Sequence, residues 1–557
     1  MSRKKDTIES KFINRAWNMF LISIILYSFL LYRLVDIQII DSDNYKEKVS
    51  NQSMQKIELN SGRGIIYDRN GKALTDVERR QIIIVEKEKL VNNYEIRELI
   101  KEVTKMDEPS IYKNIEKQIN SSVVQLEVDK IDKKTKNKLE EKGLIVEEKV
   151  LRYSSDKLLS HTIGYIKSSD KIGQSGIEKS MNDILINSNE KYVSAFKVGD
   201  AGNTKNLSIL KGSIKTINDN EESKHIKLTI DKDIQKKVEK IVSKEENPTA
   251  VVISDVDTGE ILSMSSRPTF DLNNISTNKE SNDGEFINRT IQATYPPGSV
   301  FKIVVLYAAL ENNVIDENNY SYNCIGNAKI GISGESLNCN KLDGHGIQNL
   351  QQAFSNSCNT AFLDIAIKAG QDNIIKSAKK LHLDEKVEIG LEEEKIREIP
   401  TQIAIRNLAI GQGDIEFTPL QINQMTQIIA NNGTYKPLYL YDSIIDKNKN
   451  MIKRFKTSKS ESIISPYTLT IIKEMMKDVS KEGTGKNLKD LDGGCGVKTG
   501  TAQSIVNGND INHGWISGFY PEDRPKYVIT VLVEGTAESS KSAIPIFEDI
   551  CQKLNKK

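Results

Sequence analysis

The sequence has almost no net charge. Its 78 lysine and arginine residues nearly balance 77 aspartate and glutamate residues, which leaves a formal charge of +1 at pH 7. This balance argues against a nucleic-acid-binding protein that relies on bulk positive charge. Long apolar runs are also scarce, and one stretch alone is long enough to approach a membrane span. The 557 residues are too many for one compact domain, and the ordinary apolar content predicts soluble globular domains over most of the chain.

The one long apolar run lies near the N-terminus. Residues 16–32 carry no charge, and apolar residues up to 40 extend the run to the roughly 20 residues that a bilayer-spanning helix needs. A cleaved signal peptide is the competing interpretation, but no small-residue cleavage site follows the run. Residues 1–15 are basic, which favours a cytoplasmic tail. We therefore expect a single-pass, uncleaved signal anchor at 16–40 in the cell membrane, with the rest of the chain outside the cytoplasm.

A Pro-Pro-Gly turn at 296–298 runs into an apolar segment and places Ser299 where a helix begins. Lys302 follows three residues later, so a helix would put both side chains on one face, one turn apart. A desolvated lysine loses its proton more easily and could take the proton of the serine hydroxyl, which would then act as a nucleophile. The Ser-x-x-Lys pattern is weak by itself, because Ser154 and Lys157 have the same spacing without other signs of chemistry.

Two further motifs follow in order along the chain. Residues 357–359 read Ser-Cys-Asn, and residues 498–501 read Lys-Thr-Gly-Thr. The order Ser-x-x-Lys, Ser-x-Asn, Lys-Thr-Gly is the set found in serine β-lactamases and penicillin-binding proteins, although the middle of the second motif has cysteine where that pattern has aspartate. On these motifs the chain resembles the penicillin-binding proteins, specifically the monofunctional class B D,D-transpeptidases of bacterial cell-wall synthesis.

The resemblance implies a role for each motif residue in acyl transfer. Ser299 would attack the carbonyl of a D-Ala-D-Ala peptide bond, with Lys302 as its general base. Ser357 would relay a proton to the leaving amine, and Lys498 nearby would maintain the protonation state of Ser357. The expected substrate-binding groups are the Asn359 amide, the Thr499 and Thr501 hydroxyls for the terminal carboxylate, the Ser299 and Thr501 backbone N–H groups as an oxyanion hole, and Gly500, which would leave room for the substrate.

The element signals predict an α+β catalytic domain. Helix patterns lie between strand patterns, which predicts an antiparallel sheet carrying helices on both faces, and this is also the fold that the resemblance implies. The helix patterns are at 299–312, 347–369, 419–432 and 465–479, the strand patterns at 250–264, 495–505 and 513–534, and a last amphipathic segment at 541–555.

The resemblance also divides the chain into regions. Residues 41–222 are expected to form an elongated, non-catalytic pedestal of the dimerisation type, with an Arg-Gly…Asp-Arg-Asn-Gly box at 62–74. Within it, the Lys- and Glu-rich stretch 86–149 predicts solvated helices. Residues 223–557 are expected to form the transpeptidase domain. The implied partners are peptidoglycan stem peptides, β-lactam antibiotics and a lipid II polymerase of the SEDS type.

The five cysteines are an odd number, so they cannot all pair with one another. Cys324, Cys339 and Cys358 lie between the first motif and the end of the second, and with His345 they could supply the four ligands of a tetrahedral zinc ion. Their spacing is not that of a zinc finger, but it resembles a subset of class B enzymes that carry a structural zinc beside the Ser-x-Asn motif. The alternative is a disulfide, Cys339–Cys358 or Cys324–Cys339, with one free thiol.

Two other function classes stay open beside the leading prediction of a membrane-anchored, β-lactam-sensitive transpeptidase that cross-links stem peptides. A β-lactamase or D,D-carboxypeptidase would deliver water to the acyl-enzyme, but no deacylating glutamate motif is evident and such hydrolases are usually much shorter. A β-lactam sensor or non-catalytic scaffold is the second alternative, although a sensor would need several membrane spans. Turnover of a D-Ala-D-Ala donor with an amine acceptor separates the three. A role in elongation, division or spore-cortex synthesis is not decided.

Overall fold

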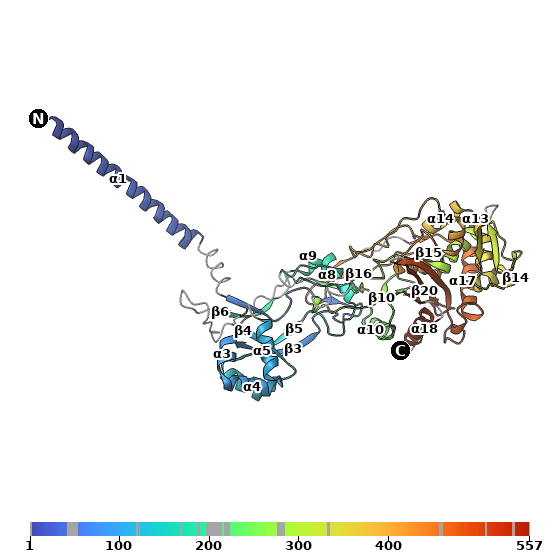
Figure 1. Ribbon diagram of the computed structural model, residues 1–557, viewed down its shortest axis with the longest axis horizontal. Coiled ribbons are helices and arrows are strands. Elements are labelled where there is room, and N and C mark those ends of the chain that lie inside the picture. The colour runs from blue at the N-terminus through green and yellow to red at the C-terminus, as the bar shows by residue number, and fades with distance from the viewer. Residues whose placement is uncertain are drawn as a thin grey trace. The chain divides into compact units, whose positions relative to one another are not determined.

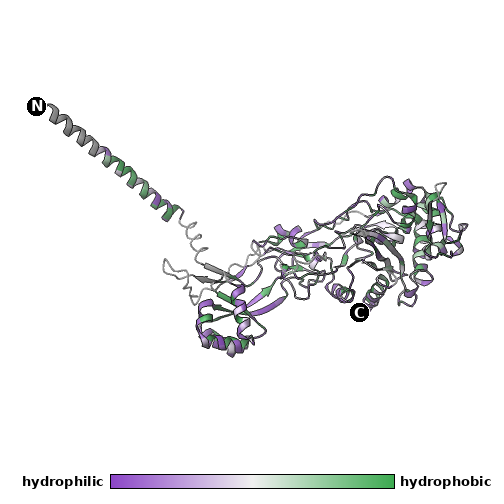
Figure 2. Ribbon diagram, viewed as in Figure 1, coloured by the Kyte–Doolittle hydropathy of each residue, from purple (hydrophilic) through white to green (hydrophobic). Residues whose placement is uncertain are grey.

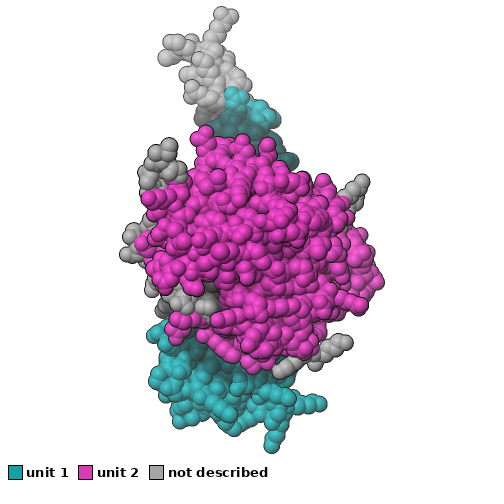
Figure 3. Space-filling view, turned by 90° about the vertical axis from the view of Figure 1, so that its right-hand side faces the viewer, with its two compact units in different colours: residues 1–60, 79–149, 190–217 teal, residues 61–78, 150–189, 218–557 magenta. Residues whose placement is uncertain are grey.

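The computed structural model describes residues 3–41, 54–118, 121, 123–167, 170–186, 190–196, 214–216, 223–275, 284–330, 335–455, 460–506, 509–536 and 541–555. The chain forms two compact units, which Figure 3 colours separately. Unit 1 combines residues 1–60, 79–149 and 190–217, and unit 2 combines residues 61–78, 150–189 and 218–557. Neither unit is continuous in sequence. The domains expected from the sequence are continuous ranges of residues, whereas each of these units gathers several separate segments that pack together.

Residues Trp17–Ile40 of unit 1 form an apolar, exposed helical segment. α1 (Arg3–Val35) continues into a π-helix, η1 (Asp36–Ile40). Residues Trp17–Ile40 are mostly hydrophobic (Figure 2), with a mean hydropathy of 1.9. None of this segment is buried. Among the described residues this is the one helix that is long and apolar enough to cross a membrane. Its position and composition suggest the membrane anchor expected at 16–40.

The remainder of unit 1 is a small α/β body. Strands pair in the order β4-β3-β5, and α4, α5 and α6 pack on this sheet through a shared core. Each of these three helices begins at an Asn or Asp side chain that accepts a backbone N–H. A second sheet has the order β1-β6-β7. The bounds are β1 Met54–Glu58, β3 Glu78–Glu86, α3 Lys87–Asn92, α4 Tyr94–Thr104, α5 Glu108–Lys117, β4 Val123–Val128, α6 Lys133–Glu141, β5 Ile145–Leu151, β6 Lys191–Phe196 and β7 Ile214–Thr216.

Unit 2 is built on a five-stranded antiparallel sheet in the order β10-β9-β21-β20-β19 (Figure 1). Its strands are β9 (Thr249–Asp255), β10 (Ile261–Ser266), β19 (Gly496–Val506), β20 (Asn509–Tyr520) and β21 (Tyr527–Val533). Helices α10 (Lys232–Val242) and α18 (Ala543–Asn555) pack on one face, and α16 (Pro419–Ala430) packs on the other. The expected α+β fold, an antiparallel sheet with helices on both faces, is confirmed.

The remaining elements of unit 2 surround this sheet. A second sheet has the order β17-β16-β8-β2, and three two-stranded pairs join β11 to β14, β12 to β13 and β15 to β18. The bounds are β2 Ile66–Tyr67, α7 Ser160–Ile163, α8 Gly176–Ser180, α9 Asn182–Leu185, β8 His225–Leu228, η3 Gly298–Phe301, α11 Lys302–Glu311, β11 Ser321–Cys324, β12 Asn327–Ile330, β13 Glu335–Asn338, β14 Gly346–Asn349, α12 Leu350–Ser355, α13 Asn359–Ala369, α14 Gln371–Lys380, α15 Ile405–Ile410, β15 Thr434–Tyr435, β16 Tyr441–Ile445, β17 Met451–Arg454, β18 Glu461–Ser462, α17 Pro466–Lys481 and η4 Lys486–Leu488.

A buried polar seam fixes α16 on the central sheet. The Asn423 side chain accepts a hydrogen bond from Ser254 Oγ at 2.6 Å and donates to Val252 O and Thr530 Oγ1, both at 3.1 Å. These groups are fully buried, so their hydrogen bonds must be satisfied within the protein. The seam sets the register of the helix against β9 and β21.

The helix expected over 347–369 is two helices rather than one. α12 ends at Ser355 and α13 begins at Asn359, and between them Ser357 has φ 54°. A residue in this left-handed conformation cannot continue a right-handed helix. The helical pattern of the sequence was therefore right in kind and wrong in continuity, and the break is what presents the second motif.

Candidate active site

Ser299 lies at the start of a helix that runs through the core of unit 2. The short helix η3 leads into α11, whose residues 302–310 are all buried. Gly298 has φ 54°, a conformation that glycine adopts without strain, and its N–H donates to Gly411 O at 2.9 Å. A methyl group on Gly298 would lie 2.7 Å from Thr501 O. The turn that carries Ser299 therefore approaches strand β19 so closely that a side chain at 298 does not fit.

Lys302 is fully buried and contacts the second motif. Its Nζ donates to Ser357 O at 2.6 Å, to Ser357 Oγ at 3.2 Å and to Asn359 Oδ1 at 2.8 Å. Burial lowers the pKa of Lys302 to about 7, an effect that the nearby Cys358 and Cys339 thiols partly oppose. An amine that is partly neutral at pH 7 is suited to act as a general base.

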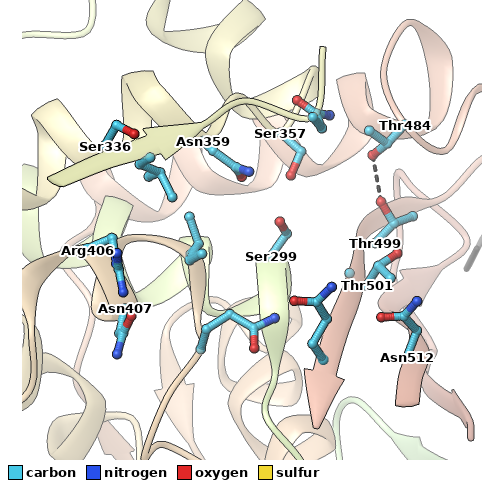
Figure 4. Close-up of a pocket in the computed structure, with 16 residues that line it drawn as sticks. Ser299, Ser336, Ser357, Asn359, Arg406, Asn407, Thr484, Thr499, Thr501 and Asn512 are labelled. Atoms are coloured by element: carbon cyan, nitrogen blue, oxygen red, sulfur yellow. Dashed lines mark hydrogen bonds between the residues drawn. The ribbon is translucent and has the colours of Figure 1, made fainter. Parts of the chain in front are cut away.

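The Ser299 hydroxyl makes no hydrogen bond to another described residue, so Lys302 is not yet paired with it. Contacts of this kind are often long or absent before substrate binds, and they tighten when the reacting groups are in place. Figure 4 shows the Ser299 and Ser357 hydroxyls pointing into the same space from opposite sides.

Lys498 meets the same serine from strand β19. Its Nζ donates to Ser357 Oγ and to Thr499 O, both at 3.1 Å. Burial, and then the charge of Lys302, lower the pKa of Lys498 well below its ordinary value. Ser357 Oγ thus receives hydrogen bonds from two buried amines. The three motifs lie together in one site, as the sequence predicted.

These residues line one cleft of about 740 Å³ in unit 2 (Figure 4). Thr499 and Thr501 lie on β19 at one side of Ser299, and Arg406 and Asn407 of α15 lie at the other (Figure 4). The lining residues are Ser299, Ser336, Leu337, Asn340, Ser357, Asn359, Arg406, Asn407, Ile410, Gln412, Thr484, Thr499, Gly500, Thr501, Gln503 and Asn512.

Two binding residues have surroundings that differ from the sequence argument. A methyl group on Gly500 would lie 3.0 Å from Pro297 O and 3.2 Å from Val300 N. Gly500 thus makes room for the Ser299 turn, and its role in leaving room for the substrate stays a prediction. The Asn359 amide, expected to meet a peptide, already donates to Asn338 O at 3.2 Å.

The three cysteines and the histidine predicted as metal ligands form one cluster. The ligand atoms of Cys324, Cys339, His345 and Cys358 all lie within 4.8 Å of one another. Cys339 Sγ is 3.7 Å from Cys358 Sγ and 3.4 Å from His345 Nδ1. The hydrogen bond between the two thiols lowers the pKa of Cys339 and raises that of Cys358, so in the absence of a metal Cys339 is the one that more readily becomes a thiolate.

The donor set and its spacing fit a tetrahedral metal. In a zinc site with bonds of about 2.3 Å to sulfur and about 2.0 Å to nitrogen, neighbouring ligand atoms lie roughly 3.5–3.8 Å apart. Two of the separations, 3.7 and 3.4 Å, agree with that spacing, and all four ligand atoms lie within 4.8 Å of one another. A disulfide needs about 2.05 Å between sulfurs, so the alternative pairings are not formed. All five cysteines are free and buried.

Comparison with known proteins agrees with this geometry. The model of the penicillin-binding protein transpeptidase domain matches residues 249–552, which is more than half of the chain. The chain belongs to this family. The penicillin-binding protein dimerisation domain matches residues 58–208, in the region expected to form the pedestal.

Relatives of this transpeptidase family match over most of the chain. Stage V sporulation protein D of Bacillus subtilis is 27% identical over 92% of this chain and 81% of its own length. The peptidoglycan D,D-transpeptidase MrdA of Acinetobacter baumannii is 25% identical over 98% of this chain and 88% of its own. The penicillin-binding protein PBP2 of Helicobacter pylori, solved as a complex with MreC, has the same fold, with a TM-score of 0.63 and 23% identity over 90% of this chain and 99% of that one.

Thr484 and Gln412 are two of the cleft residues to which the sequence motifs gave no role. Thr484 Oγ1 and Thr499 Oγ1 are 2.6 Å apart (Figure 4), and Thr484 N donates to Ser355 O at 3.1 Å. Gln412 contacts strand β19. Both residues belong to glycine-flanked stretches, Gly483-Thr-Gly485 and Gly411-Gln-Gly413, that were visible in the sequence. The flanking glycines were the available signal, because close backbone approach commonly requires them.

Proposed function

We propose that the chain is a membrane-anchored peptidoglycan D,D-transpeptidase that works through an acyl-enzyme on Ser299. The observation that carries the proposal is the convergence of two buried lysines, Lys302 and Lys498, on the Ser357 hydroxyl in the cleft that Ser299 lines. Burial favours the neutral amine, which can take the proton of an attacking hydroxyl. The D,D-transpeptidases among the relatives support the same reaction.

Acylation follows from these contacts. Ser299 Oγ attacks the carbonyl carbon between two D-alanines, and Lys302 Nζ accepts the hydroxyl proton. Ser357 Oγ accepts hydrogen bonds from both lysines, which leaves its own hydrogen for the departing D-alanine amine. Lys302 then returns a proton to Ser357. Lys498 is favoured in its neutral form, so it adds little positive charge beside Lys302. A β-lactam acylates Ser299 by the same attack, with the ring nitrogen as leaving group.

Deacylation consumes an amine in place of water. The amino group of a second stem peptide attacks the ester carbonyl on Ser299, and neutral Lys302 accepts the proton of that amine. The ester C–O bond then breaks, and Lys302 returns the proton to the Ser299 oxygen. The products are the cross-linked peptide and the free enzyme. The steps balance without an oxidant, a reductant or a metal.

Strand β19 supplies most of the substrate contacts. The Thr499 and Thr501 hydroxyls bind the terminal carboxylate of the donor. The backbone N–H groups of Ser299 and Thr501 bind the developing oxyanion, and a donor of this kind is worth about 3–4 kcal/mol of barrier. Asn359 contacts the donor backbone with the part of its amide that Lys302 and Asn338 leave unused.

The cysteine cluster holds a structural zinc ion. Four protein ligands leave no open position for water, so the metal would act on conformation and not on the reaction. Cys358 is next to Ser357, whose positive φ is costly for a residue other than glycine. A metal bond at Cys358 would hold Ser357 and Asn359 in place on either side of it.

The basic residues before the anchor favour an orientation in which the enzyme lies outside the cytoplasm. Residues 1–15 form the cytoplasmic tail, 16–40 the anchor, 41–222 the pedestal and 223–557 the transpeptidase domain. The partner that the family resemblance suggests is a lipid II polymerase of the SEDS type. The complex of the Helicobacter pylori protein with MreC supports a role for partner proteins in this family.

Intact-mass analysis with benzylpenicillin tests the acyl-enzyme. We expect one stable adduct on the wild-type protein and none on the Ser299→Ala variant, whose circular dichroism should be unchanged. Incubation with a D-Ala-D-Ala donor and an amine acceptor then separates the function classes. Cross-linked product supports a transpeptidase, hydrolysis alone indicates a carboxypeptidase, and an adduct on a different serine contradicts the assignment of Ser299.

A further inference from the structure

The cleft follows a sheet edge at which no other described strand pairs. Strand β19 is the last strand in the order of the central sheet, with β20 on its other side. In an antiparallel sheet, alternate residues direct both N–H and C=O to the same edge. Such an edge can accept a peptide as an additional strand. The number of β19 residues whose edge N–H and C=O groups are unpaired decides how much of a substrate backbone can bind there.

The Gln412 side chain occupies this edge at Gln503. With the carboxamide oriented to satisfy both groups, its nitrogen donates to Gln503 O at 3.2 Å and its oxygen accepts from Gln503 N at 3.1 Å. The Gln412 carboxamide thus forms two hydrogen bonds with the backbone N–H and C=O of Gln503, as a residue of a neighbouring strand would. Because Gln503 points to the open edge, Thr501, two residues earlier, points there as well.

The loop that carries Gln412 is held on both sides. Gly411 and Gly413 have φ values of 68° and 80°, and a methyl group on Gly411 would lie 2.0 Å from Gly298 O. The Gln412 N–H donates to Asn407 O at 2.9 Å. Gly411 O also accepts from Gly298 N at 2.9 Å, next to Ser299. The backbone beside Gln412 is therefore anchored to the Ser299 turn and to α15, which fixes the point from which its side chain reaches β19.

We propose that Gln412 is a specificity-determining residue that ends the peptide-binding edge of β19. The inference rests on the proposed function. A donor peptide pairs its acylated residue with Thr501, and the donor residue two positions earlier finds the backbone of Gln503 already paired. The upstream donor chain therefore leaves the sheet edge and continues toward α15, where Arg406 and Asn407 line the cleft.

The substrate class that follows is a donor whose backbone is extended over a short stretch next to the acylated residue. A strand-like peptide of greater length gains nothing from its upstream backbone. The enzyme thereby gives ordinary extended polypeptides no advantage, because their added residues find no hydrogen-bonding edge. Recognition beyond Thr501 must come from donor side chains and not from the donor backbone.

Backbone N-methylation of the donor tests this directly. Two acyl donors that end in D-Ala-D-Ala are compared, one with a free N–H two residues before the acylated residue and one with that nitrogen methylated. In the wild-type protein we expect equal kcat/KM for Ser299 acylation. In Gln412→Ala, the freed edge at Gln503 should favour the unmethylated donor by roughly three- to tenfold, the usual effect of one or two net hydrogen bonds. Gln552→Ala, on the exposed side of α18, is the matched control and should behave like wild type.

Each protein is judged by the ratio of its two donors, so a general loss of rate in one variant cancels. A wild-type ratio of three or more would show that substrate displaces Gln412, and it would overturn the proposal without the use of any variant. A ratio near one in folded Gln412→Ala would overturn it too, and Gln412→Leu provides a second variant if the alanine protein does not fold. Failure of Ser299 acylation by benzylpenicillin in the wild type would instead refute the proposed function.

Discussion

The pH dependence of acylation follows from the burial of Lys302. The pKa of this amine is lowered from an ordinary 10.5 to about 7, because the buried site disfavours its charged form. The neutral amine is the base, so acylation should become faster as pH rises through the pKa. With a pKa near 7, the neutral fraction is about one tenth at pH 6, one half at pH 7 and nine tenths at pH 8. The rate should therefore rise roughly tenfold between pH 6 and pH 8 and then level off.

Stopped-flow acylation with a chromogenic β-lactam, measured from pH 5.5 to 9.5, provides the test. An unburied lysine would have less than about 1% neutral amine at pH 8, and the rate would still rise tenfold per pH unit there. Continued increase beyond pH 9 would thus refute the reasoning about burial. Lys302→Arg is the matched variant, because arginine keeps its proton throughout this range, and acylation should fall by roughly 10²–10⁴-fold with no midpoint near pH 7.

Three further predictions concern the walls of the cleft. Thr484→Val removes the hydroxyl contact with Thr499 and should raise the KM of D-Ala-D-Ala donors roughly three- to tenfold with a smaller effect on kcat, whereas Thr484→Ser should restore it, as steady-state kinetics will show. Cys339→Ser should reduce bound zinc, measured by mass spectrometry of the folded protein, from about one ion per chain to a small fraction, whereas Cys495→Ser should retain it. Gly500→Ala should destabilise the protein by about 1–3 kcal/mol in urea unfolding, since its methyl group meets the backbone of the Ser299 turn, and unchanged stability would contradict that packing.

The chemistry was readable from the sequence because it depends on residue types at short spacings. Ser299 and Lys302 are one helical turn apart, and a Pro-Pro-Gly turn before an apolar run is a local signal for a helix start. Lys498 lies in a strand pattern with glycine two residues away on either side. Such local signals do not need the tertiary fold. The family motifs in their order, the apolar N-terminal run and the strand-helix-strand pattern of the catalytic half could be predicted for the same reason.

Other features depended on contacts between distant segments. The helical pattern around Ser357 gave no sign that the helix breaks there, because the left-handed φ is stabilised by tertiary partners that include Lys302. The pairing of Thr484 with Thr499 spans 15 residues, and Gln412 reaches Gln503 from a loop far away in the chain. The glycines beside Thr484 and Gln412 indicated that the backbone there packs closely against another segment, but they did not indicate which segment.

The sequence by itself determined which groups could react and roughly where helices and strands begin. The fold alone decided that two lysines contact one serine hydroxyl. The fold also lowers the pKa values of both lysines, because the packed core removes water from their amines. It also decided that four ligand atoms lie within bonding range of one metal ion and that one side chain occupies the edge of β19. Burial and proximity arise when segments far apart in sequence pack together, and a linear pattern of residues does not contain them.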